Sequence, residues 1–277
     1  MRRTSILLGL MLALPLAVAP TAGAVDLSAS IVNVAPTIVS ITLSGLTSGS
    51  LTPVAGGSAT VTATVVAADI NGFNDISGVT VGIIRPDGTT VHLAQAAGTF
   101  SSGSLLEATY TKALAMSFYD AAALTTSTYK VKAIATDAGA LTGTNALTLA
   151  TFNYGQLVAL NTPSTLDLGG SGISPGAAGS ITSLGVQNYG NQQIDTQVSG
   201  TALTYSSSSI PVGSIAYSLA SDMSGSAALT GSAATLSGFD LVSGASSTKT
   251  TYFQLTAPTG LPPGSYTGTL TVTAVSG

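Results

Sequence analysis

The chain has 277 residues, of which 45% are hydrophobic and 6% are charged, and its formal net charge is −4. Seven Lys and Arg residues against eleven Asp and Glu residues leave no basic surface to neutralise phosphates, which argues against nucleic-acid binding. The absence of cysteine and the presence of a single histidine exclude thiol catalysis, iron–sulfur clusters and zinc sites built from Cys and His.

The first residues have the three parts of a secretory signal peptide. Met1-Arg2-Arg3 is followed by an apolar run over residues 6–18 and by the small residues Ala22-Gly23-Ala24. The alternative is an uncleaved membrane anchor, but the run is shorter than the roughly 20 residues of a membrane span, and Pro15 interrupts it. We therefore predict a signal peptide at residues 1–24, no membrane span in the mature chain, and an extracellular, cell-surface location.

Residues 25–35 form an N-terminal extension in which apolar and polar residues alternate from Val25 to Ile31, and Pro36 separates it from the next predicted strand. Alternation of this kind predicts a β-strand. This strand has three possible fates: it pairs with its own sheet, it enters the sheet of a neighbouring subunit by strand exchange, or it remains a disordered tail. The expected partners are other copies of this chain or other cell-surface proteins.

The dominant hydrophobic period over residues 36–155 is two, which predicts half-buried strands. Residues 85–88 read as a tight hairpin turn, Tyr129 as a corner tyrosine that bonds back to a loop, and residues 112–124 as the one stretch able to hold a helical turn. The strands of this first domain are predicted near residues 37–44, 58–67, 79–85, 89–95, 105–112, 127–135 and 144–152.

Residues 156–277 show the same alternation of apolar and polar residues, but they are not an exact sequence repeat of residues 36–155. The strands of this second domain are predicted near residues 164–168, 180–187, 192–198, 213–219, 235–241, 248–256 and 265–275. Many short strands separated by turn signals indicate antiparallel sandwiches. The predicted fold class is all-β, with two tandem antiparallel β-sandwiches after the signal peptide.

Three stretches resemble immunoglobulin-like domains of exported archaeal and bacterial surface proteins. These are Asp69-Ile70-Asn71-Gly72-Phe73-Asn74-Asp75-Ile76 with the strand that follows it, Val186-Gln187-Asn188-Tyr189-Gly190-Asn191, and Leu261-Pro262-Pro263-Gly264-Ser265-Tyr266-Thr267-Gly268-Thr269-Leu270. The motifs are turns and strand starts. The resemblance implies immunoglobulin-like sandwiches on the cell surface, and it carries over no catalytic residue.

The densest polar cluster in the sequence is formed by Asp69, Asn71, Asn74 and Asp75. Closely spaced oxygen ligands on a loop suit a hard cation such as calcium. The same residue types also shape turns by accepting hydrogen bonds from nearby backbone N–H groups, so calcium binding and turn formation both remain open. We predict no other cofactor. His92, within an alternating run, is expected to be a surface histidine of a strand.

Two functions follow from these observations. The first is a non-enzymatic structural component of the cell exterior, such as a subunit of a surface layer, a pilus-like filament or a matrix. Its few charges would let neighbouring surfaces pack closely without desolvating ions. The second is a secreted adhesin or binding module that recognises a glycan or a protein through its loops. No residue is predicted to be catalytic.

Overall fold

The computed structural model describes residues 27–124, 126–170 and 172–277. The predicted signal peptide at residues 1–24 and the start of the extension at residues 25–26 lie outside the described residues. The described chain is almost entirely β-structure, as the sequence predicts, with two short 3-10 helices, η1 (Phe73–Asp75) and η2 (Val212–Ser214). No helix among the described residues has the length and apolar character needed to cross a membrane.

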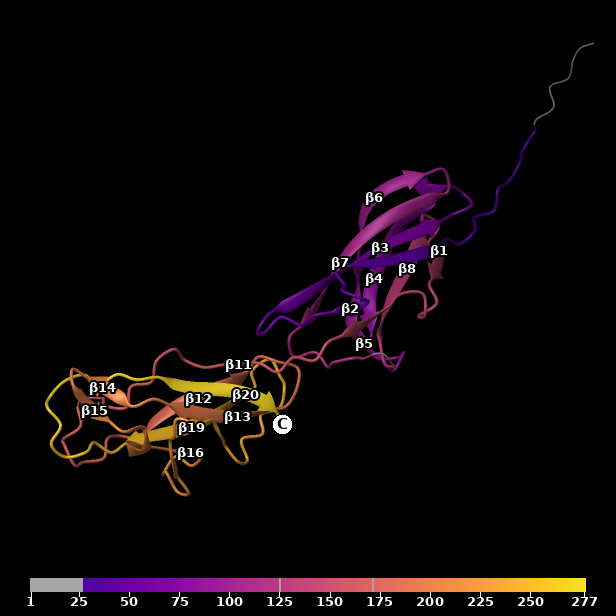
Figure 1. The fold of residues 1–277 in the computed structure, drawn as a ribbon. Helices are drawn as coiled ribbons and strands as arrows, with labels where there is room; N and C mark the ends of the chain where they lie inside the picture. Colours follow the sequence, from indigo (N-terminus) through magenta and orange to yellow (C-terminus); the bar gives the residue numbers. More distant parts are fainter. Residues whose placement is uncertain (1–26, 125, 171) are drawn as a thin grey trace, which may run out of the picture. The chain divides into compact units, whose positions relative to one another are not determined.

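Residues 37–154 form a β-sandwich of two sheets (Figure 1). The first sheet has the order β1-β3-β7-β6, with β1 (Thr37–Ser44), β3 (Ser58–Ala68), β7 (Glu107–Ser117) and β6 (Thr99–Ser104). The second has the order β2-β10-β8-β4-β5, with β2 (Ser50–Leu51), β10 (Thr151–Tyr154), β8 (Tyr129–Asp137), β4 (Ile76–Ile84) and β5 (Val91–Ala97); β9 (Thr142–Thr144) pairs with β8. All of these ladders are antiparallel except the short parallel pair of β2 and β10.

The core of this sandwich follows directly from the period-two pattern. Alternate residues of β3, among them Val61 and Val65, meet Leu114 of β7, and they face Val81 and Val131 of the other sheet. All five side chains are fully buried. Burial of one such aliphatic side chain contributes roughly 1.5–3 kcal/mol to the free energy of folding. The alternation of apolar residues therefore determines which face of each strand of the first sandwich is buried.

Residues 160–276 form a second set of sheets. One sheet has the order β11-β12-β19-β16-β17, with β11 (Leu160–Asn161), β12 (Thr182–Asn188), β19 (Thr248–Leu255), β16 (Ile215–Ser218) and β17 (Ala227–Ala228). A second has the order β18-β13-β20, with β18 (Ala234–Thr235), β13 (Ile194–Gly200) and β20 (Leu270–Ser276), and β14 (Leu203–Tyr205) pairs with β15 (Ser208–Ile210). Leu184 and Phe253 of the larger sheet belong to one core cluster with Ile194 and Val198 of the smaller one.

Two local predictions are confirmed. The backbone N–H of Gly88 donates to the carbonyl of Arg85 at 2.9 Å, and that of Arg85 donates to Thr90 at 2.8 Å, which closes the β4–β5 hairpin. The hydroxyl of Tyr129 donates to the carbonyl of Ala121 at 2.9 Å, as expected of a corner tyrosine.

Other element predictions are wrong. Residues 112–124 hold no helical turn in the structure: β7 runs to Ser117 and pairs with β3 throughout, because Leu114 and Met116 continue the alternation of buried residues. Residues 164–168 are irregular. Residues 235–241 hold the end of β18, a turn closed by Phe239 and Leu236, and an isolated antiparallel bridge between Leu241 and Ile194, but no continuous strand. The strand predicted near residues 265–275 is present as β20, but it begins at Leu270.

Candidate functional site

The last strand of the second sandwich, β20, has an apolar face that is incompletely covered. Leu270, Val272 and Ala274 point towards the core but are only half-buried, whereas the inward residues of β3 and β8 in the first sandwich are buried. On one side β20 pairs with β13 over seven residues, and on its other side no described strand pairs with it. Both the side chains and one backbone edge of β20 are therefore open to a further element.

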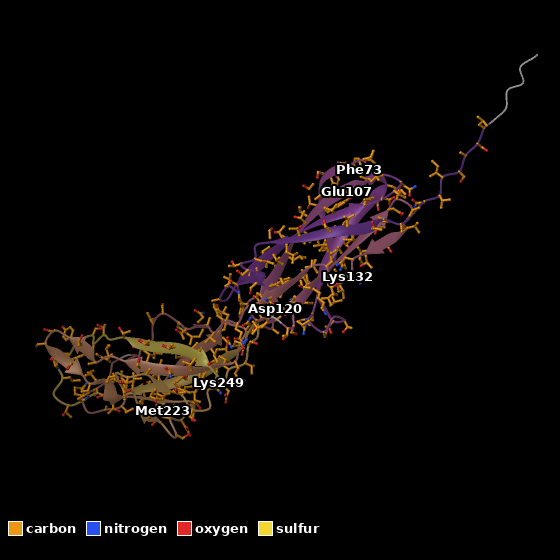
Figure 2. All side chains as sticks on the ribbon, turned by 45° about the vertical axis from the view of Figure 1, so that its right-hand side comes forward. Phe73, Glu107, Asp120, Lys132, Met223 and Lys249 are labelled. Atoms are coloured by element: carbon orange, nitrogen blue, oxygen red, sulfur yellow. The ribbon has the colours of Figure 1, made fainter. Side chains whose placement is uncertain are left out.

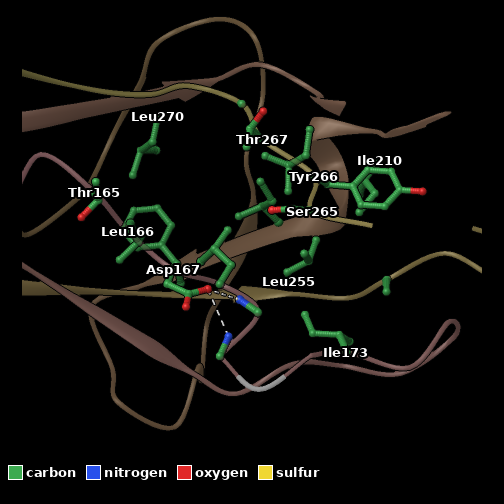
Figure 3. Close-up of a pocket in the computed structure, with 18 of the residues that line it drawn as sticks. Thr165, Leu166, Asp167, Ile173, Ile210, Leu255, Ser265, Tyr266, Thr267 and Leu270 are labelled. Carbon is green, nitrogen blue, oxygen red and sulfur yellow. Dashed lines mark hydrogen bonds between the residues drawn. The ribbon is translucent and has the colours of Figure 1, made fainter. Parts of the chain in front are cut away.

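A cavity of about 1240 Å³ lies against this face of β20. Figure 3 shows Leu166, Ile173, Ile210, Leu255 and Leu270 around it. Small-molecule pockets usually measure about 300–1,000 Å³, so this cleft offers more room than a typical small ligand fills. We call it the β20 cleft.

One wall of the β20 cleft is formed by residues 162–170, which belong to no strand. Asp167 accepts hydrogen bonds from the backbone N–H groups of Gly169 and Gly170, at 2.8 and 3.1 Å, which fixes a turn where residues 164–168 were predicted to be a strand (Figure 3). A second wall is formed by residues 261–270, where the hydroxyl of Tyr266 donates to the carbonyl of Pro262 at 3.0 Å. Each wall is thus held by its own short-range hydrogen bonds.

The described part of the N-terminal extension carries exposed apolar side chains. Leu27 is 95% exposed and Ile31 is 87% exposed. Residues 27–36 lie outside the strands of the described structure, although their sequence alternates as a strand does. This is the part of the predicted strand that the structure describes.

The predicted metal residues Asp69 and Asp75 lie close together, and a third carboxylate joins them. Each of Asp69, Asp75 and Asp137 has a carboxylate oxygen within 4.8 Å of those of the other two. We call these three residues the acidic cluster. They come together because β3 ends before Asp69, η1 ends at Asp75, and β8 ends at Asp137, which pairs with Ile76 at the start of β4.

The two asparagines of the predicted cation site lie in the loop between Asp69 and Asp75. Asn71 is exposed, and its Oδ1 accepts a hydrogen bond from the backbone N–H of Val34 at 2.9 Å. Asn74 is exposed too. Turn chemistry is present in the same loop: Asp69 Oδ1 accepts the backbone N–H of Asn71 at 2.8 Å, and Gly72 donates to the carbonyl of Asp69.

Asp137 is not among the candidate ligands predicted from the sequence. Its signal was the same as that of Asp69, namely a carboxylate directly after an alternating strand. Which strand ends meet at one end of a sandwich depends on strand order, and the sequence does not state that order.

His92 lies in a strand, β5, as predicted, but the prediction that it is a surface residue is wrong. Its side chain is only 11% exposed, and its Nε2 lies 3.1 Å from Oδ2 of Asp120, which also accepts the backbone N–H of Ser117. The ring of His92 packs 5.1 Å from that of Tyr129. These contacts join β5 to the loop between β7 and β8, so they explain the histidine structurally.

The chain matches no known protein-family model and no curated protein. A solved structure aligns with 88% of this chain and 84% of its own chain, at 10% sequence identity and a TM-score of 0.31. That structure is described as "Chaperone-tip adhesin complex is vital for synergistic activation of CFA/I fimbriae biogenesis". An overlap this weak carries no argument about the present chain.

Proposed function

We propose that this protein is an exported, non-enzymatic structural component of the cell exterior, built of immunoglobulin-like sandwiches. In this proposal, copies assemble head to tail: residues 25–35 of one copy enter the β20 cleft of the next. The observation that carries the proposal is the half-covered apolar face of β20 beside a cavity of about 1240 Å³.

The extension has the side-chain pattern that the cleft requires. In an extended strand, Leu27, Ala29 and Ile31 lie on one face, with successive members roughly 6.6 Å apart. Leu27 and Ile31 are exposed in the described structure, so inserting them into the cleft would remove apolar surface from water. The side chains of Leu270 and Val272 would gain the cover that they lack.

The backbone of β20 supports the same arrangement. A strand with an unpaired side presents N–H and C=O groups that can pair with an added strand. Pairing supplies main-chain hydrogen bonds, while the alternate side chains enter the cleft and set the register. The donor and acceptor surfaces differ, so each addition exposes the same pair of surfaces again. Contacts of this kind build open filaments or lattices, unless the rotation between copies closes a ring.

Strand donation is tested with the signal-free protein, residues 25–277. Ile31→Asp places a charge on the face that enters the cleft, and burying that charge without a partner is strongly unfavourable. We expect the wild-type protein to form ordered polymers by light scattering and negative-stain microscopy, and the Ile31→Asp variant to remain monomeric. Val242→Asp is the matched control, because Val242 is a 60% exposed apolar residue outside the extension.

A second arm examines the cleft directly. A labelled peptide with the sequence of residues 25–35 is added to protein that lacks residues 25–33, and binding is followed by fluorescence anisotropy. The peptide should bind, and the same peptide with Ile31→Asp should not. Polymers that form equally well with Ile31→Asp, together with no peptide binding, would refute strand donation. A soluble monomer that is retained on glycan arrays would favour the adhesin instead.

A further inference from the structure

The acidic cluster gathers three carboxylates at one end of the first sandwich. Asp69 and Asp137 are each 2% exposed, and Asp75 is partly buried. Their oxygens lie within 4.8 Å of one another. Three like charges at this separation repel one another unless protons or a cation neutralise them.

Two of these oxygens also lack hydrogen-bond donors. Asp69 Oδ2 and Asp75 Oδ2 are both buried, and neither accepts a hydrogen bond from the described residues. Asp69 is held by its other oxygen, Oδ1, which accepts the backbone N–H of Asn71. Buried polar atoms are nearly always partnered, so an unpartnered pair beside a third carboxylate indicates a missing positive group.

We propose that Asp69, Asp75 and Asp137 bind a calcium ion. Calcium binds oxygen ligands at about 2.3–2.6 Å, so two oxygens on the same ion lie at most about 5 Å apart, and the 4.8 Å limit falls within this range. Magnesium usually keeps several of its waters, and a site in which Asp69 and Asp137 are each 2% exposed has little room for them. The proposed carboxylate ligands are therefore two of the residues suggested by the sequence, Asp69 and Asp75, together with Asp137.

The ion would stabilise the loop that connects the two sheets. Asp69 follows β3 of one sheet, whereas Asp75 and Asp137 flank the β4–β8 ladder of the other. The same loop carries Asn71, which accepts the backbone N–H of Val34 where the N-terminal chain reaches β1. Figure 2 locates this end of the sandwich by its labels for Phe73, which lies within the loop, and Glu107, which pairs with Ala68 at the end of β3.

Calcium binding is tested by thermal unfolding and calorimetric titration of the signal-free protein. The wild-type melting temperature should rise by several degrees between EDTA and 1 mM calcium, because a ligand that binds only the folded state stabilises it. Asp75→Asn keeps the shape of the side chain but removes one ligand charge, so it should lose this rise. Asp240→Asn, which changes an exposed acid of the second sandwich, should keep it.

The two variants also separate metal binding from simple charge repulsion. In EDTA, Asp75→Asn should be at least as stable as the wild type, because it removes a like charge from the cluster. In calcium the order should reverse. Equal wild-type melting temperatures in EDTA and in calcium, with no heat on titration, would overturn the site. An equal response to magnesium would overturn the assignment to calcium.

Discussion

At the scale of single residues, Asp87 shows how a side chain determines a turn. Its Oδ1 accepts the backbone N–H groups of Thr89 and Thr90, each at 2.8 Å. The pKa of Asp87 lies well below its ordinary value. The largest cause is a hydrogen bond from the side chain of Thr90, followed by hydrogen bonds from the backbone N–H groups of Thr89 and Thr90. Since the folded-state pKa is the lower one, the resulting stability is present above the unfolded pKa of about 4 and is lost as the pH falls through the folded-state pKa. We therefore expect Asp87→Ala to lower the free energy of unfolding at pH 7, and the difference from wild type to shrink at pH 3. Urea unfolding at both pH values measures this, and an equal difference at the two would contradict it.

At the scale of strands, β4 and β5 approach each other closely at a glycine. A Cβ on Gly82 would lie 2.6 Å from the carbonyl oxygen of Leu93, at a point where the register between the strands shifts. Because this obstacle is backbone, we expect Gly82→Ala to push β5 away and to lower the free energy of unfolding by about 1–3 kcal/mol. Gly78→Ala is the matched control in the same strand, since a Cβ there would meet nothing within 4 Å. Chemical denaturation of the two variants compares them, and equal effects would show that the close approach does not matter.

At the scale of the whole molecule, the sparse charge determines how copies would associate. Only 6% of the residues are charged, and the proposed contact joins an apolar cleft to a segment whose one charged residue is Asp26. Salt screens interactions between exposed charges and leaves the burial of apolar surface largely intact. We therefore expect polymer yield, measured by sedimentation, to change less than twofold between 50 and 500 mM NaCl. A steep fall with salt would show that charged groups hold the copies together.

The sequence by itself determined the local parts of this protein. Thr/Val and Thr/Ala alternation fixes which residues of β3 and β20 face inwards, because successive side chains of a strand point to opposite sides. The Arg85–Gly88 turn and the corner role of Tyr129 follow from chemistry within a few residues. Asp69 and Asp75 are close for the same reason, since only five residues separate them.

Only the tertiary structure decided the rest. Asp137 joins the acidic cluster because strand order brings the ends of β3 and β8 to one end of the sandwich. Residues 164–168 form no strand, because the side chain of Asp167 accepts backbone hydrogen bonds that fix a turn there. These residues instead line the β20 cleft. Strand order and cleft shape arise from contacts between residues far apart in sequence. The alternation with a period of two cannot predict them, because it is the same in every strand and does not say which strands pair.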